Sequence, residues 1–267
     1  MITNSDQYLK EQYKTSTNLD IRIRLHELYS NSVTDWHKWV FDNISFDDKQ
    51  CIIEFGCGSG ILWAKNLNKI NKDWNILLSD MSEGMLHKSR QNTRDMHNFR
   101  FKHIDVQNTD LESSIFDIAI ANHMLYHVPD INKALIEIRR ILKPDGTLYA
   151  ATNGLSHMGE IYELVEGFNA TLPLTKPSNS KYFGLENGGE ILSDVFDDVN
   201  LLKYESHLKI TNVQDLVEYM YSMDNLFKEE LLSQGAYEDF VNYLENKKNN
   251  QGYIHVTKAS GLFICNS

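Results

Sequence analysis

The stretch that decides the fold is residues 52–63, which read Ile-Ile-Glu-Phe-Gly-Cys-Gly-Ser-Gly-Ile-Leu-Trp. An apolar run reaches Glu54, three glycines follow at alternate positions, and helix-forming residues come next. Glycine lets a ligand approach the backbone closely, and the N–H groups that open a helix face that ligand. The spacing is GxGxG, whereas the dinucleotide fingerprint GxGxxG requires glycine where this sequence has Ile61. The stretch therefore predicts a strand, a ligand-binding turn and a helix.

Outward from this turn, short β-branched runs alternate with helical stretches, which is typical of a parallel sheet with crossover helices. We expect strands at residues 51–55, 74–80, 99–105, 116–122 and 147–153. The clearest helix is 130–142, where apolar residues form one stripe and Asp130 can act as the N-cap. Further on we expect a helix at 155–168, a strand at 196–210, helices within 213–247, and a last strand or hairpin at 253–265.

Three carboxylates stand at the ends of successive predicted strands: Glu54, Asp80 and Asp105. Ligands of open α/β sheets bind at these carboxyl edges, and an acid after the second strand can accept hydrogen bonds from a ribose diol. Each acid also has a plain alternative. Asp80 could be the N-cap of a helix beginning near Glu83, and Asp105 could be a solvated loop residue.

Together these residues resemble the motifs of the class I S-adenosylmethionine-dependent methyltransferases. Residues 54–60 resemble the family's first motif, Asp80 the acidic second motif, 103–106 the adenine motif, 116–123 with 125–130 the fourth motif, and 142–148 the loop before the fifth strand. The resemblance covers residues 50–153. It implies an α/β fold with a doubly wound, mostly parallel seven-stranded sheet containing one antiparallel strand.

The resemblance also implies S-adenosylmethionine as cofactor and assigns residues to its parts. The glycine loop would line the methionine moiety, the acid after the second strand would hold the ribose, the third strand end would address the adenine, and the fourth would lie near the methionine end. By this carry-over the expected cofactor-binding residues are Glu54, Gly56, Cys57, Gly58, Gly60, Asp80, Met81, Asp105, Val106, Asn122 and His123.

Residues 1–47 predict a helical cap ahead of the methyltransferase domain, which we place at 48–267 with helical insertions at about 155–195 and 211–248. In similar methyltransferases such helices often close over the cofactor, so Tyr13 and Arg22 join the expected cofactor-binding residues. For Trp36 and Trp39 we favour simple packing.

A methyl group on a sulfonium is already activated, so no nucleophilic side chain is required. A general base helps only when the acceptor must lose a proton, and the candidates are His123, Tyr126, His127 and His157. A lone histidine at such a position is more often a hydrogen-bonded loop residue than a base. We expect no metal site, because the residue after His123 is Met124 rather than the Glu of a zinc-binding HExxH helix.

The 267 residues contain 26 Lys and Arg against 37 Asp and Glu, a formal net charge of −11. Such a field repels phosphate backbones and favours neutral or cationic ligands. The three cysteines form no CxxC pair, the N-terminus lacks a signal-peptide pattern, and no apolar run of about 18 residues occurs. We therefore expect a cytoplasmic protein with no membrane partner.

The favoured function is methyl transfer to a nucleophilic O, N, S or C atom of a small molecule by in-line displacement. An RNA methyltransferase is the nearest alternative; the net charge and the lack of an Asn-Pro-Pro-aromatic sequence after Asn122 argue against it. A nicotinamide-dependent dehydrogenase is a further alternative, disfavoured by Ile61, and so is a non-catalytic S-adenosylmethionine-binding module. The sequence leaves the acceptor and the oligomeric state open.

Overall fold

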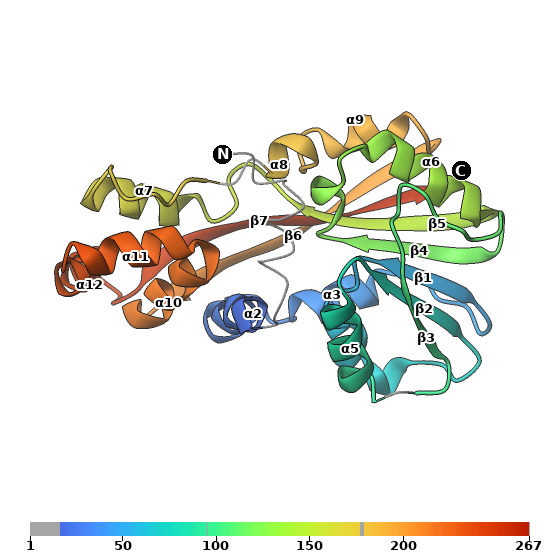
Figure 1. The fold of residues 1–267 in the computed structure, drawn as a ribbon, viewed down its shortest axis with the longest axis horizontal. Coiled ribbons are helices and arrows are strands. Elements are labelled where there is room, and N and C mark those ends of the chain that lie inside the picture. The colour runs from blue at the N-terminus through green and yellow to red at the C-terminus, as the bar shows by residue number, and fades with distance from the viewer. Residues whose placement is uncertain (1–16, 95, 177–178, 267) are drawn as a thin grey trace.

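A computed structural model describes residues 17–94, 96–176 and 179–266 (Figure 1). Within these residues seven strands form one sheet in the order β3-β2-β1-β4-β5-β7-β6. The strands are β1 Cys51–Phe55, β2 Asn75–Asp80, β3 Phe99–His103, β4 Phe116–Asn122, β5 Leu142–Asn153, β6 Asp198–Ile210 and β7 Ile254–Asn266. Strands β1 to β5 are parallel, and β7 runs antiparallel to both of its neighbours. The expected seven-stranded sheet with one antiparallel strand is confirmed.

Helices cover both faces of the sheet (Figure 1). One face carries α3 Trp36–Asp42, α4 Ile61–Ala64, η1 Leu67–Lys69 and α5 Glu83–Asn92; the other carries η2 Leu125–His127, α6 Ile131–Ile141, α8 Asn179–Tyr182 and α9 Gly188–Ser193. Alternation along β1 supplies both cores, since Ile52 packs with the first group and Ile53 with the second. The doubly wound arrangement follows from strands that are apolar on both sides.

Three predicted boundaries were wrong in detail. Strand β3 ends at His103, so Asp105 lies in the loop that follows rather than on the strand. Strand β5 was expected to begin at residue 147 but begins at Leu142. The turn residues 143–146 therefore lie within β5, where they form an irregularity in its pairing with β4. The helix predicted at 155–168 begins only at Gly159.

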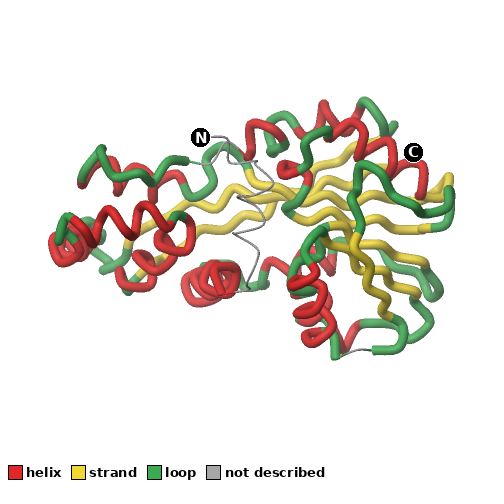
Figure 2. The backbone as a smooth tube through the Cα atoms, in the orientation of Figure 1, coloured by secondary structure: helices red, strands yellow, loops and turns green. Residues whose placement is uncertain are grey.

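The last two strands extend far beyond the rest of the sheet. Strand β7 pairs with β5 only through Ser260–Cys265, whereas its pairing with β6 continues to Ile254. This two-stranded ribbon projects away from the sheet (Figure 2). It carries a second core with α7 Gly159–Phe168, α10 Val213–Met223, α11 Asn225–Ser233 and α12 Tyr237–Asn246. The segment predicted as a strand or hairpin is thus one long strand.

Helix α2 Thr17–Tyr29 and the residues after it connect this ribbon to the sheet. Tyr204 on β6 donates its hydroxyl to the carbonyl of Thr34 at 2.6 Å. Lys65, at the end of α4, bridges the carboxylates of Glu27 and Asp35, each at 2.6 Å. The N-terminal helices therefore form a wall between the ribbon and the glycine loop. The boundary at residue 47 stays a prediction.

Helices long and apolar enough for a bilayer span are absent from the described residues.

Candidate active site

The loop after β1 turns through three glycines with positive φ, at +60° for Gly56, +55° for Gly58 and +70° for Gly60. A Cβ atom at Gly56 would lie 2.7 Å from the Cβ of Met124, which follows β4. A Cβ atom at Gly60 would lie 2.4 Å from the hydroxyl of Ser89 on α5. Side chains are thus excluded at these positions by backbone conformation and by close approach.

Asp80, the last residue of β2, holds this loop. Its Oδ2 accepts the backbone N–H of Gly58 at 2.9 Å, and its Oδ1 accepts that of Ser82 at 2.8 Å. The N-cap of α5 is Ser82, which accepts from Met85, so Asp80 is not that cap. Burial raises the pKa of Asp80 despite these hydrogen bonds. Each carboxylate oxygen retains a second acceptor position for a ligand.

Glu54 lies almost fully buried beneath the loop. Trp63 donates its indole N–H to Glu54 Oε2 at 2.6 Å, and the side-chain amide of Asn122 donates to Oε1 at 3.3 Å. Burial raises the pKa of Glu54 to about 8, and the charge of Asp80 acts in the same direction, while the two hydrogen bonds oppose it. The carboxyl group is therefore largely protonated at neutral pH.

The side of the site predicted to take adenine is formed by the ends of β2 and β3. Met81 is 59% exposed, whereas Val106 is buried beside Ile104. Asp105 accepts the backbone N–H of Gln107 at 2.9 Å through Oδ1. This combination offers apolar side chains around a flat ring and a carboxylate at its edge.

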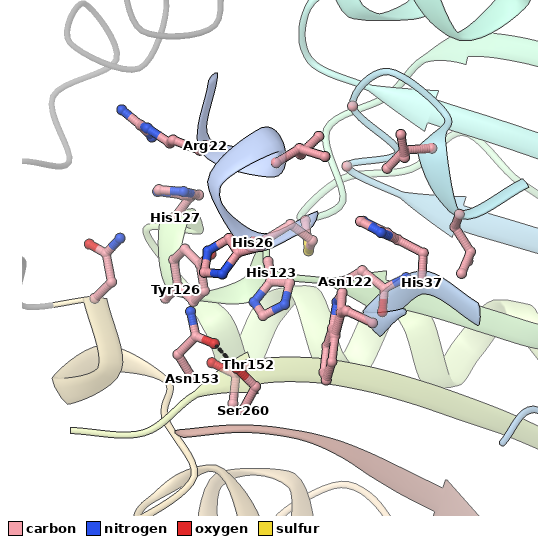
Figure 3. A pocket seen from close by; sticks show the side chains of 18 of the residues that line it. Arg22, His26, His37, Asn122, His123, Tyr126, His127, Thr152, Asn153 and Ser260 are labelled. Atoms are coloured by element: carbon pink, nitrogen blue, oxygen red, sulfur yellow. Dashed lines mark hydrogen bonds between the residues drawn. The ribbon is translucent and has the colours of Figure 1, made fainter. Parts of the chain in front are cut away.

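The exit of β4 carries the aromatic and histidine residues. His123 has a φ of +52°, held by its N–H donation to the carbonyl of Ala151 at 2.9 Å. Its ring lies 5.3 Å from Trp36 and 6.5 Å from Tyr126. Figure 3 shows the side chains of His123 and Tyr126 close to that of His26 from α2, with Asn153 and Ser260 below them in the view.

Buried histidines line this part of the site. The rings of His26 and His157 lie 6.2 Å apart, and His157 Nδ1 lies 3.4 Å from the hydroxyl of Ser260. Burial lowers the pKa values of His123 and His157 to about 3 and that of His127 to about 4. These imidazoles are therefore neutral at pH 7, and burial makes each of them a weaker proton acceptor than a free imidazole.

A cavity of about 1420 Å³ connects these groups. Fourteen of the predicted site residues line it: Arg22, Glu54, Gly56, Cys57, Gly58, Asp80, Met81, Asp105, Val106, Asn122, His123, Tyr126, His127 and His157. Gly60 is not among the lining residues; it shapes the turn into α4. Tyr13 lies outside the described residues. Arg22 reaches the cavity from α2 and also donates to Ser222 on α10.

Several residues that line the cavity were not predicted from the sequence. Trp36, expected only to pack, stacks on Trp39 and also faces the cavity. Lys258 and Ser260 enter it from β7, and Tyr204 from β6. Within the described residues no group of His, Cys, Asp and Glu side chains is arranged to hold a metal ion.

Comparison with known proteins adds the family. A model described as a methyltransferase domain matches residues 53–150, the part that contains the glycine loop, Asp80 and the exit of β4. This part of the chain is therefore similar to methyltransferase domains, as its motifs predict. S-adenosylmethionine is the methyl donor of class I methyltransferases. The match therefore confirms the cofactor that the sequence predicts.

The chain is 31% identical over 114 residues to the demethylmenaquinone methyltransferase of Staphylococcus saprophyticus, covering 42% of this chain and 48% of the relative. The match to the Staphylococcus epidermidis enzyme of the same name is 28% over 160 residues, or 56% of that relative. The chain thus spans about half the length of the curated relatives it matches.

Solved structures show the same fold over most of this chain. The [4+2]-cyclase SpnF superposes with a TM-score of 0.59 at 16% identity, covering 97% of this chain and 96% of SpnF. A Haemonchus contortus phosphoethanolamine N-methyltransferase, solved with phosphomonomethylethanolamine and S-adenosylhomocysteine, gives 0.56 at 18% identity, covering 99% of this chain and 59% of that one. At these identities the likeness concerns the fold alone.

Proposed function

We propose that this chain transfers a methyl group from S-adenosylmethionine to a nucleophilic atom of a small molecule. The observation that carries the proposal is one cavity that runs from the glycine loop, Asp80 and Glu54 to the histidines at the exit of β4. A cofactor and an acceptor can therefore meet inside one enclosure.

The residues at the first end fit this cofactor, which has a carboxylate, an amino group and a diol but no pyrophosphate. The glycine loop excludes side chains where a ligand must approach the backbone. Asp80 keeps free acceptor positions for two ribose hydroxyls, Glu54 offers a carboxyl group beneath the loop, and Val106 with Met81 offers apolar contact to a flat base. We assign these residues, with Gly56, Cys57, Asp105, Asn122 and Arg22, to cofactor binding.

The volume of the cavity supports a second ligand. Pockets for a single small molecule usually enclose about 300–1000 Å³. The cavity here, at about 1420 Å³, is larger. The N-terminal helices and the β6–β7 ribbon line its outer side and shield the reacting atoms in part from bulk water.

Bound S-adenosylmethionine supplies a methyl group on a positively charged sulfur, ready for in-line attack. The chain's own residues then place the acceptor and take up its proton where one is lost. We assign that base to His123 because of its position, since it directly follows Asn122 at the end of β4 and lines the cavity. His157, Tyr126 and His127 surround the acceptor.

Several observations favour a small acceptor over RNA. The acceptor end is walled by buried side chains, and the net charge of −11 opposes a polyanion. The relatives named demethylmenaquinone methyltransferase carry the name of a small acceptor. We place the reaction in the cytoplasm, supported by three cysteines that are all free thiols.

Isothermal titration calorimetry with S-adenosylhomocysteine and with NAD tests the cofactor. We expect micromolar or tighter binding of the first and none of the second. The acceptor class is tested by incubating the protein with methyl-labelled S-adenosylmethionine and either the small-molecule fraction of a cell extract or total RNA. Label in a small molecule other than S-adenosylmethionine supports the proposal, while label in RNA, or NAD binding, would overturn it.

A further inference from the structure

Strand β7 places a lysine on a face that is otherwise apolar. Side chains at alternate positions of a strand share one face, so Ile254, Val256, Lys258, Ser260 and Leu262 point the same way. Ile254 and Val256 pack in the core under the ribbon, and Leu262 packs in the core of the sheet. Between the two cores lies the cavity, and Lys258 and Ser260 line it.

Lys258 is buried there without an ion-pair partner. Its side chain belongs to a residue that is only 8% exposed, and its ammonium lies 5.1 Å from the centre of the Tyr204 ring. Within the described residues no carboxylate pairs with it and no hydrogen bond to its ammonium is formed. Asp35 acts on it through charge, but Asp35 already accepts from Lys65 at 2.6 Å.

An unpaired buried ammonium is costly, and burial lowers the pKa of Lys258 to about 8. The group still keeps most of its charge at neutral pH. That charge, after burial, is the next cause that lowers the pKa of His26, and it also acts on His123 and His157. Lys258 is therefore electrostatically part of the histidine group at the acceptor end.

The two ends of the cavity differ in charge. The carboxylates of Asp80 and Asp105 lie at the cofactor end, on the carboxyl edge of the sheet. Lys258 lies at the other end, on the ribbon. Although the whole chain carries a charge of −11, Lys258 brings a buried positive charge to the acceptor end, so the net charge alone does not describe the ligand that this end suits.

The walls around Lys258 are aromatic. Trp36 and Tyr204 rings lie 5.1 Å apart, and Trp36 also contacts His123 at 5.3 Å. His26 contacts the edge of Tyr219 at 6.1 Å on the α10 side. Such walls accommodate a flat apolar body, while the ammonium requires an anionic oxygen.

We propose that the methyl acceptor is a small organic acid whose planar body lies between these aromatic rings and whose anionic oxygen accepts a hydrogen bond from Lys258. The inference rests on the proposed methyl transfer and narrows its substrate class. In it Lys258 is the residue that selects and orients the acceptor, and the histidines, being neutral, add no competing charge.

The test uses the full chain saturated with S-adenosylhomocysteine and calorimetric titration with matched probes. One arm compares benzoate with benzamide and indole-3-acetate with indole-3-acetamide, for a carboxylate. The other compares 2,4-dinitrophenolate with 1,3-dinitrobenzene, for an ionised hydroxyl. Each pair keeps the flat body and changes the anionic oxygen.

Three variants accompany the wild type. Lys258→Met keeps length and removes charge, Lys258→Arg keeps charge, and Lys203→Met removes an exposed lysine of β6 that is not among the cavity-lining residues. A thermal melt checks folding, and we expect Lys258→Met to melt no lower than the wild type, because it removes an uncompensated buried charge.

We expect at least one acid to bind about tenfold or more tightly than its neutral partner in the wild type and in Lys203→Met. The preference disappears in Lys258→Met and remains in part in Lys258→Arg. Equal binding of acid and neutral partner, no acid binding at millimolar concentration, or an unchanged preference in Lys258→Met would each overturn the inference. If S-adenosylhomocysteine itself fails to bind, the proposed function fails instead.

Discussion

Asp80 Oδ2 accepts the backbone N–H of Gly58 at 2.9 Å, so the last residue of β2 fixes the glycine loop that leaves β1. The same carboxylate accepts from Ser82 and opens into the cavity. One side chain thus holds the shape of the loop and, in the proposed function, also accepts hydrogen bonds from the ribose. These two tasks cannot be separated by removing the side chain, which decides how its variants are designed.

In the wild type, the two carboxylate oxygens of Asp80 accept the backbone N–H groups of Gly58 and Ser82. Replacing Asp80 with Asn puts an amide NH2 group in the place of one of these oxygens, so one of the two hydrogen bonds is lost. We expect the affinity for S-adenosylhomocysteine to fall by about 1 to 3 kcal/mol, through the lost charged acceptor and the displaced loop. Calorimetry measures this, with the exposed Asp73→Asn as matched control. Unchanged affinity in Asp80→Asn would remove the ribose assignment.

Gly58→Ala places a side chain at a φ of +55°, in the left-handed region. A non-glycine residue there costs about 1 to 2 kcal/mol, and we expect that loss in the free energy of unfolding together with weaker cofactor binding. The control is Gly189→Ala on α9, where the nearest atom to a new Cβ lies at 3.7 Å and no positive φ is required. Equal effects of the two variants would contradict the role of the loop.

The buried carboxyl group of Glu54 leads us to expect that the free energy of unfolding falls as the pH rises. Because burial raises its pKa from 4.5 to about 8, the folded chain holds a proton that the unfolded chain has released. This contribution is fully present below the unfolded value and is lost as pH rises toward 8, at a slope of about 1.4 kcal/mol per pH unit. Urea unfolding of wild type and Glu54→Gln between pH 6.5 and 8 measures it. Parallel curves for the two proteins would show that Glu54 is not protonated in the fold.

For the buried histidines we expect the opposite dependence, in which the free energy of unfolding falls as the pH is lowered. Burial lowers the pKa of His123 from 6.5 to about 3 and that of His157 equally, so the unfolded chain binds protons that the folded chain refuses. Their contribution is complete above about pH 6.5 and is lost as pH falls toward 3. His157→Gln should therefore lose less stability than the wild type between pH 6.5 and 4. The exposed His87→Gln serves as control and should follow the wild type.

The sheet and the cofactor end could be predicted from the sequence because their signals are local. Residues 52–63 contain strand, turn and helix in one run, and the acids follow apolar strands directly. Asp105 was placed on a strand that ends two residues earlier, since no residue type marks that end. The hydrogen bond from Gly58 to Asp80 could not be predicted from the sequence, because it joins two segments that are distant in sequence.

The acceptor end could not be predicted, because it is assembled from the N-terminal helices, the exit of β4 and the ribbon. The length of the ribbon depends on β6 pairing with β7, a register that neither strand encodes alone. Lys258 did leave a signal, since it interrupts the apolar alternation of Ile254, Val256 and Leu262. A lysine on such a face indicates a buried charge. The structure adds that this lysine lines the cavity, where a ligand can reach it.

The most direct test of the central claim is a crystal structure of the chain soaked with S-adenosylhomocysteine. The account predicts its ribose hydroxyls on Asp80, its amino acid part against the loop at Gly56 and Gly58, and its sulfur facing His123 across the cavity. A ligand bound elsewhere, or density only for a different nucleotide in that loop, would contradict it.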